Sequence, residues 1–118
     1  MYSAQVLDHF QNPRNAGEVE SPSASAELEN PACGDVLRLS VRIEGDRIAE
    51  IRFLAQGCVA AMACASALTE LASQKSLADA CRLQRADVVN AVGGLPHASS
   101  HASHLAVDTL RALLQQLV

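Results

Sequence analysis

The feature that most constrains the fold is a period-two alternation of apolar and polar residues that runs from Val36 to Ala55 and is interrupted once. This period is typical of a β-strand with one face in the core and the other in water. The interruption, Glu44-Gly45-Asp46-Arg47, has the composition of a turn. The pattern therefore predicts an antiparallel hairpin, whose core-facing side chains would be Leu37, Leu39, Val41, Ile43, Ala49, Ile51, Phe53 and Ala55.

Helical patterns flank this hairpin on both sides. A long run from Val59 to Ser73 is rich in alanine and contains neither glycine nor proline, which predicts a helix buried between other elements. Glu18 to Glu29 has little to bury and is interpreted as a surface loop or a weak edge strand. Further helices are predicted at Ser3 to Phe10 with Ser3 as N-cap, after Ser76 through Cys81, after Asp87 through Val92, and from His101 to Leu117.

Length and composition narrow the class of protein. A chain of 118 residues is expected to form one domain, residues 1–118, with a core of small aliphatic side chains. The net charge of −4 and a single lysine, Lys75, argue against binding to nucleic acid or to an anionic membrane. The start of the chain has no signal-peptide pattern, so we expect a cytoplasmic protein whose four cysteines are not a disulfide framework.

Four residues with metal-binding chemistry lie beside glycines or small residues. Cys33 and Asp35 flank Gly34 before the first strand of the hairpin, and Cys58 follows Gly57 at the start of the long helix. His101 opens the last helix. Two thiolates, a carboxylate and an imidazole would suit Zn²⁺ or iron if the fold brings them together. The alternative is that the cysteines are scattered packing residues in a small-residue core.

The position of Cys58 suggests a second property. The N-terminus of a helix presents free amide groups and a partial positive charge, both of which favour a thiolate. On this basis we expect the pKa of the Cys58 thiol to be lowered, which would make it a better ligand and nucleophile.

Several segments together give the chain a specific resemblance. The segments are Leu7-Asp8-His9-Phe10-Gln11-Asn12-Pro13-Arg14-Asn15, Pro31-Ala32-Cys33-Gly34-Asp35-Val36, Arg52-Phe53, Gly57-Cys58, Leu68-Thr69-Glu70, and His101 with Leu105-Ala106-Val107-Asp108. In this order the chain resembles the U-type iron–sulfur cluster assembly scaffolds, typified by IscU and the N-terminal domain of NifU. The resemblance extends over nearly the whole chain.

The resemblance implies a fold and a role. The fold would be a compact α+β domain in which a small antiparallel β-sheet packs against several helices. The protein would be a non-enzymatic scaffold that builds a [2Fe–2S] cluster from iron and from sulfur supplied by a cysteine desulfurase, and then passes it to acceptor apo-proteins. Cys33, Asp35, Cys58 and His101 would be the site residues, with Zn²⁺ able to replace the cluster. A homodimer is one of two alternatives, because the cluster could lie within one chain or between two.

Two departures from the family pattern affect this interpretation. The family has His-Cys at the start of the last helix, whereas this chain has His101-Ala102, so the third cysteine, associated with accepting sulfur, is missing. Leu95-Pro96 is followed by His97 rather than completing the Leu-Pro-Pro-Val-Lys motif of bacterial members. We therefore do not expect an Hsp70-type chaperone to bind.

The chain has other cysteines and histidines that are candidates to replace the missing thiol. Cys64 is six residues after Cys58 and should point elsewhere on a continuous helix, and both Cys64 and Cys81 are expected to be small buried packing residues. His104 shares a helix face with His101 and is the better substitute ligand, although a surface histidine is the alternative. His97 is a weaker candidate, and His9 is interpreted as a packing or docking residue.

The missing cysteine leaves two further hypotheses for the function. In the first, the chain is a zinc- or iron-binding regulatory partner of a cysteine desulfurase that does not assemble clusters. In the second, it is a zinc-dependent persulfide acceptor that uses Cys58.

Overall fold

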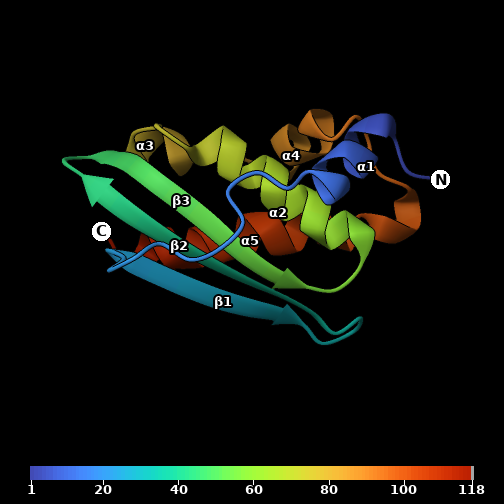
Figure 1. The fold of residues 1–118 in the computed structure, drawn as a ribbon, viewed down its shortest axis with the longest axis horizontal. Coiled ribbons are helices and arrows are strands. Elements are labelled where there is room, and N and C mark those ends of the chain that lie inside the picture. Colours follow the sequence, from blue (N-terminus) through green and yellow to red (C-terminus); the bar gives the residue numbers. More distant parts are fainter. Residues whose placement is uncertain (118) are drawn as a thin grey trace.

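The computed structural model describes residues 1–117 and consists of a three-stranded antiparallel sheet with helices packed on one face (Figure 1). The strands are β1 (Ala24–Asn30), β2 (Asp35–Glu44) and β3 (Arg47–Gln56), in the order β1-β2-β3. The expected α+β class and the antiparallel hairpin are confirmed. The helical elements are α1 (Ala4–Gln11), α2 (Val59–Ala72), α3 (Leu77–Ala80), α4 (Arg85–Ala91), the 3₁₀ turn η1 (His97–Ser99) and α5 (His101–Gln115).

The inner face of the sheet carries the apolar half of the alternation. Leu37, Leu39 and Val41 of β2 are at most 2% exposed, and they pack in one core with residues of α2 and α5. The alternation in β3 departs from the prediction at its start, because a register shift between Arg42 and Ile43 buries Ile48 instead of Ala49. A bulge of this kind adds a residue to one strand and changes which side chain faces the core.

The segment Glu18 to Glu29 resolves into two parts. Ala24–Asn30 is the edge strand β1, paired with β2 from Ala24 with Val41 to Asn30 with Asp35. The residues before it cross the outer face of the sheet from the free edge of β3 to β1 (Figure 1). On the way, the Val19 amide donates to the Ser40 hydroxyl at 2.9 Å, and Val19 is buried.

Helices α2 and α5 cover the sheet, while α1 and α4 pack on them from outside (Figure 1). The alanine-rich α2 is surrounded as expected, because small side chains allow close approach on all sides. Ser3 caps α1 by accepting from the Val6 amide at 3.0 Å, as predicted. Helix α4 begins earlier than predicted, at Arg85, because Gln84 and Asp87 form its capping box.

The arrangement brings three chain connections to one end of the molecule. The β1–β2 loop, the β3–α2 connection and the start of α5 all lie at this end, opposite the described C-terminal part of α5 (Figure 1). In sequence these points are far apart. Their meeting is what makes a shared site from Cys33, Cys58 and His101 geometrically feasible.

Candidate metal centre

Asp35 lies at the centre of the cluster at this end. It is the first residue of β2 and is 2% exposed. Its Oδ1 accepts a hydrogen bond from the Cys58 amide at 3.1 Å, and its Oδ2 lies 3.2 Å from His101 Nε2 and 3.5 Å from Cys58 Sγ. Cys58 Sγ and His101 Nε2 are 3.9 Å apart. One carboxylate therefore joins the starts of both long helices.

Cys33 approaches the same carboxylate from the β1–β2 loop. One ligand atom each from Cys33, Asp35 and His101 lies within 4.8 Å of the other two. Cys33 is exposed, His101 is half-buried and Asp35 is buried, so the set opens to solvent on the thiol side. Cys58 adjoins this set through its contacts with Asp35 and His101. The structure thus gathers the four residues that the sequence singled out, although whether they bind a metal stays a prediction.

Cys58 occupies the N-cap of α2, as its place in the sequence suggested. Its Sγ accepts a hydrogen bond from the Ala61 amide at 3.3 Å. The expectation of a lowered thiol pKa is nevertheless wrong. Burial raises the pKa of Cys58, and the negative charge of Asp35 raises it further, against the opposing effect of the Ala61 amide. In the absence of a cation the pair therefore favours a protonated thiol beside an ionised carboxylate.

Asp35 itself stays acidic despite its burial. Burial alone would raise the pKa of Asp35, but the Cys33 thiol and the Cys58 amide and thiol donate to it, and the nearby His101 adds a favourable interaction. The net result is a pKa below the ordinary value for aspartate. A carboxylate that ionises readily, surrounded by two thiols and an imidazole, is an arrangement that favours a cation.

His104 is not drawn into this set. It is exposed on α5, and its ring faces the guanidinium of Arg85, with Arg85 Nη1 3.4 Å from His104 Nδ1. His104 and His101 do line one shallow groove between β1 and α5, together with Leu28, Glu29, Asn30, Pro31, Leu105 and Asp108. A role for His104 as a ligand would require its ring to leave Arg85.

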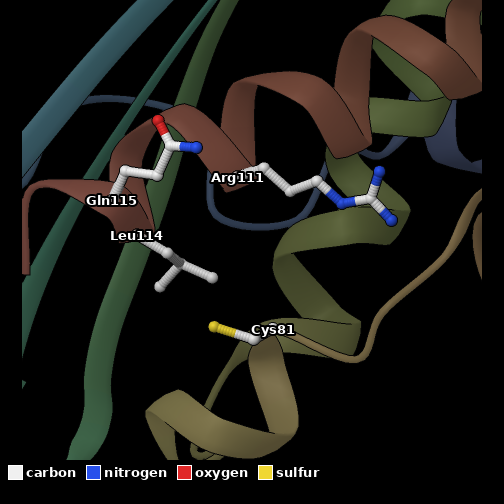
Figure 2. Close-up of a pocket in the computed structure, with 4 residues that line it drawn as sticks. All are labelled: Cys81, Arg111, Leu114 and Gln115. Carbon is white, nitrogen blue, oxygen red and sulfur yellow. The ribbon is translucent and has the colours of Figure 1, made fainter. Parts of the chain in front are cut away.

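The remaining cysteines lie away from the cluster. Cys64 is fully buried as expected, and burial raises the pKa of its thiol to about 12. Cys81 was expected to be buried but is exposed, because it is the residue that caps the end of the short helix α3 rather than part of its packed face. Figure 2 shows Cys81 beside Leu114 in a shallow pocket that Arg111 and Gln115 also line.

The other two histidines also lie outside the cluster. His97 is exposed at the start of η1. His9 packs, as interpreted from the sequence: it is 7% exposed, and its Nδ1 lies 2.8 Å from the Ser66 hydroxyl of α2.

One residue that shapes the site did not stand out in the sequence. Asn30, at the end of β1, accepts hydrogen bonds from the loop that carries Cys33. Its signal was available, since asparagine before a proline commonly begins a turn by bonding the backbone two residues on.

Comparison with known proteins places the chain in a family. The model of the family described as "NifU-like N terminal domain" matches residues 1–117. "Iron-sulfur cluster assembly scaffold protein IscU 1" of Archaeoglobus fulgidus is 43% identical over 111 residues, which are 94% of this chain and 72% of that protein. The chain belongs to the NifU-like N-terminal domain family. The IscU scaffold protein of Aquifex aeolicus is 37% identical to this NifU-like chain over 116 residues, covering 97% of the chain and 74% of that protein.

Solved structures agree with the NifU-like fold. The N-terminal part of a nitrogen-fixing NifU-like protein from Brucella abortus has a TM-score of 0.82 at 13% identity and covers 98% of this chain and 92% of that one. A putative iron–sulfur cluster assembly scaffold from Fervidobacterium islandicum has a TM-score of 0.80 at 19% identity, with 96% of each chain covered. At these identities the likeness concerns the fold alone. Within residues 1–117, no helix is long and apolar enough to cross a membrane.

Proposed function

We propose that this NifU-like chain is a scaffold or carrier that holds a [2Fe–2S] cluster, built from iron and from sulfur supplied by a cysteine desulfurase, and passes it to acceptor apo-proteins. The observation that carries the proposal is the meeting of Cys33, Asp35, Cys58 and His101 at one solvent-facing end. The names of the relatives from Archaeoglobus fulgidus and Aquifex aeolicus support the same role. In this role the chain binds and releases its cargo and is not itself an enzyme.

The donor set suits a cargo that must be given up. A [2Fe–2S] cluster is commonly held by four cysteine thiolates. Here the donor set would be two thiolates, an imidazole and a carboxylate. Nitrogen ligation raises the reduction potential of such clusters, and a carboxylate is a weaker ligand for iron than a thiolate. We expect the cluster to be labile, which suits transfer to another protein.

The missing third cysteine bears on how sulfur arrives. Ala102 follows His101 and is 1% exposed, packed in the main core. Sulfur transfer from a desulfurase would then have to use Cys33 or Cys58, of which Cys33 is the exposed one. Docking of an Hsp70-type chaperone is not part of the proposal, because His97 follows Leu95-Pro96 where the family motif has a second proline.

A second candidate function follows from the same donor set. Two thiolates, one nitrogen and one oxygen are also a tetrahedral set for Zn²⁺. A chain that keeps zinc would act as a regulatory partner of the desulfurase, or would accept persulfide sulfur on Cys58, without building a cluster. The absence of a third thiol at Ala102 favours this alternative.

Anaerobic reconstitution separates the two functions. The chain is incubated with ferrous iron, cysteine, a desulfurase and a thiol reductant, which supplies the remaining electrons that convert persulfide sulfur to sulfide. Iron, zinc and acid-labile sulfide are then quantified beside the visible spectrum. Equal amounts of iron and sulfide with a visible band support the scaffold. Stoichiometric zinc that survives desulfurase turnover, with no bound iron, would reject it in favour of the regulatory role. A persulfide mass increment on Cys58 or Cys33, read in a parallel reaction without the reductant, would identify the acceptor.

Variants sharpen this experiment. Ala102→Cys should raise cluster yield if the missing thiol limits sulfur delivery, and His104→Ala should lower it only if His104 leaves Arg85 to become a ligand. Cys33→Ser and Cys58→Ser should abolish cluster formation. Cys81→Ser is the matched control, because Cys81 is an exposed thiol outside the site and its loss should change nothing.

A further inference from the structure

Asn30 is the residue around which the Cys33 loop is folded. It is the last residue of β1 and pairs in register with Asp35, so only residues 31 to 34 close the connection to β2. Its backbone carbonyl accepts from the Gly34 amide at 2.8 Å and from the Cys33 amide at 3.3 Å. A four-residue connection held by the residue that precedes it has few alternative shapes.

The side chain of Asn30 adds a contact that the backbone alone cannot make. Its Oδ1 accepts from the Ala32 amide at 3.1 Å. Three successive amides of the loop, those of Ala32, Cys33 and Gly34, therefore point at one residue. The Cys33 Sγ also lies 4.0 Å from the Asn30 carbonyl oxygen. Residues 31 to 34 are exposed, so these contacts to Asn30 are what holds the backbone of the loop that carries the thiol.

Gly34 completes this geometry. Its φ of +73° lies in the left-handed region, which turns the chain from the loop into Asp35. The Cys33 thiol is thereby held next to the buried carboxylate and within 4.8 Å of it and of a His101 ring nitrogen.

We propose that Asn30 is a positioning residue: its side-chain turn fixes the Cys33 loop in the conformation that presents the thiol to Asp35 and His101. The inference rests on the proposed function, since it assumes that a metal ion or cluster binds there. Without the turn, the exposed loop would have to be ordered at the moment of binding, and the metal affinity would fall by that cost. Asn30 itself is not a ligand in this account.

The test is titration of the whole chain with Co²⁺ in place of Zn²⁺, because thiolate-to-cobalt charge-transfer absorption reports how many sulfurs bind. Asn30→Ala removes Oδ1 and should weaken binding about tenfold, and it should reduce the charge-transfer intensity toward that of Cys33→Ser. Asn30→Ser can form a similar turn without adding charge and should recover much of the affinity, and Asn30→Asp should recover at least as much. Asn12→Ala, an exposed asparagine that bonds Asp8, is the matched control.

A second readout shows whether Asn30→Ala acts through the loop or through folding. Amide hydrogen exchange at Ala32, Cys33 and Gly34 should accelerate in the apo protein, while the thermal midpoint and the exchange of α2 stay close to those of the unaltered chain.

Three outcomes count against these ideas in different ways. Unaltered affinity and spectrum in Asn30→Ala would overturn the positioning role alone, as would an affinity loss that neither Asn30→Ser nor Asn30→Asp recovers. Failure of the unaltered chain to bind cobalt, zinc or iron would overturn the proposed function and the positioning role with it.

Discussion

The carboxylate of Asp35 occupies the space in which a Cβ on Gly57 would lie. Gly57 also has a φ of +147°, a backbone conformation that residues with side chains rarely adopt. The close approach allows the Cys58 amide to reach Asp35 Oδ1. The position of the Asp35 carboxylate therefore requires a glycine immediately before Cys58.

Gly57→Ala should damage the site and the fold together. The methyl group would displace the buried Asp35 carboxylate and strain the backbone, for a loss of about 3 kcal/mol in the free energy of unfolding and roughly a hundredfold loss in Zn²⁺ affinity. Denaturant unfolding and zinc titration measure the two. Gly45→Ala is the control: its φ is +64° but nothing lies within 4 Å of the added methyl, so we expect a cost of about 1 kcal/mol and no change in affinity. Equal effects of the two substitutions would contradict this account.

Asp35→Asn should make Cys58 more reactive. Burial raises the pKa of the Cys58 thiol first, but the Asp35 charge and its hydrogen bond raise it as well, so removing the charge lowers the pKa. Alkylation of Cys58 at pH 8 should then be faster by roughly two- to tenfold. The rate is read in a background with Cys33→Ser and Cys81→Ser, where Cys64 stays unreactive because it is buried. A slower reaction in the variant would mean that Asp35 activates the thiol.

His9 should make stability depend on pH. Burial lowers the pKa of His9 first and the Arg14 charge lowers it further, while Glu70 and Asp8 oppose the change. The unfolded chain, with a histidine pKa of about 6.5, therefore binds the proton more readily than the folded chain. The contribution of neutral His9 to the free energy of unfolding is fully present above about pH 6.5. It is lost as the pH drops from there through the folded pKa, and the loss levels off below that pKa.

The matched substitution for His9 is Asn, whose amide can keep the contact of Nδ1 with the Ser66 hydroxyl without titrating. The free energy of unfolding of His9→Asn, measured from pH 7.5 to 5, should have a shallower slope than that of the unaltered chain. Identical slopes would show that the proton binds elsewhere.

Metal should protect two thiols and leave a third untouched. Bound Zn²⁺ is expected to slow alkylation of Cys33 and Cys58 by about tenfold or more, because a coordinated thiolate is a poor nucleophile and is sterically covered. Cys81 is exposed beside Leu114 and Arg111, away from the site, and serves as the internal control (Figure 2). Mass spectrometry of the separated peptides measures each rate, and equal protection of Cys81 would indicate general compaction rather than coordination.

Much of the fold could be predicted because its signals are local. Alternation at Leu37, Leu39 and Val41 reflects a strand with one buried face, and the alanine run after Cys58 reflects a surrounded helix. The alternation pattern gave a wrong prediction at the start of β3, where the pairing register between β2 and β3 decides which side chain is buried. The shift between Arg42 and Ile43 buries Ile48 in place of Ala49, and pairing across a turn cannot be read from one strand's pattern.

The sequence predicted which side chains meet at this end of the molecule, but not their electrostatics. Cysteine and aspartate beside glycines, and a histidine at the start of a helix, indicated the candidate ligands, and the resemblance to the family supported the same set. The predicted lowering of the Cys58 pKa was wrong, because burial and the Asp35 charge outweigh the effect of the helix N-terminus. Both arise from long-range packing. The contact between His104 and Arg85 could not be predicted either, since it joins residues 19 apart in sequence on two different helices.

The segment that crosses the outer face of the sheet has a consequence for the order of assembly. The Val19 amide bonds Ser40 of β2 and the Gly17 amide bonds Phe53 of β3, so the two contacts can form together only once these strands are paired. Helix α1 precedes that crossing and packs chiefly on α2. It can therefore pack in its native position only after the hairpin and α2 have formed. We expect α1 to be the last element to join during folding and the first to detach under mild denaturant, leaving the cluster of Cys33, Cys58 and His101 intact for a time.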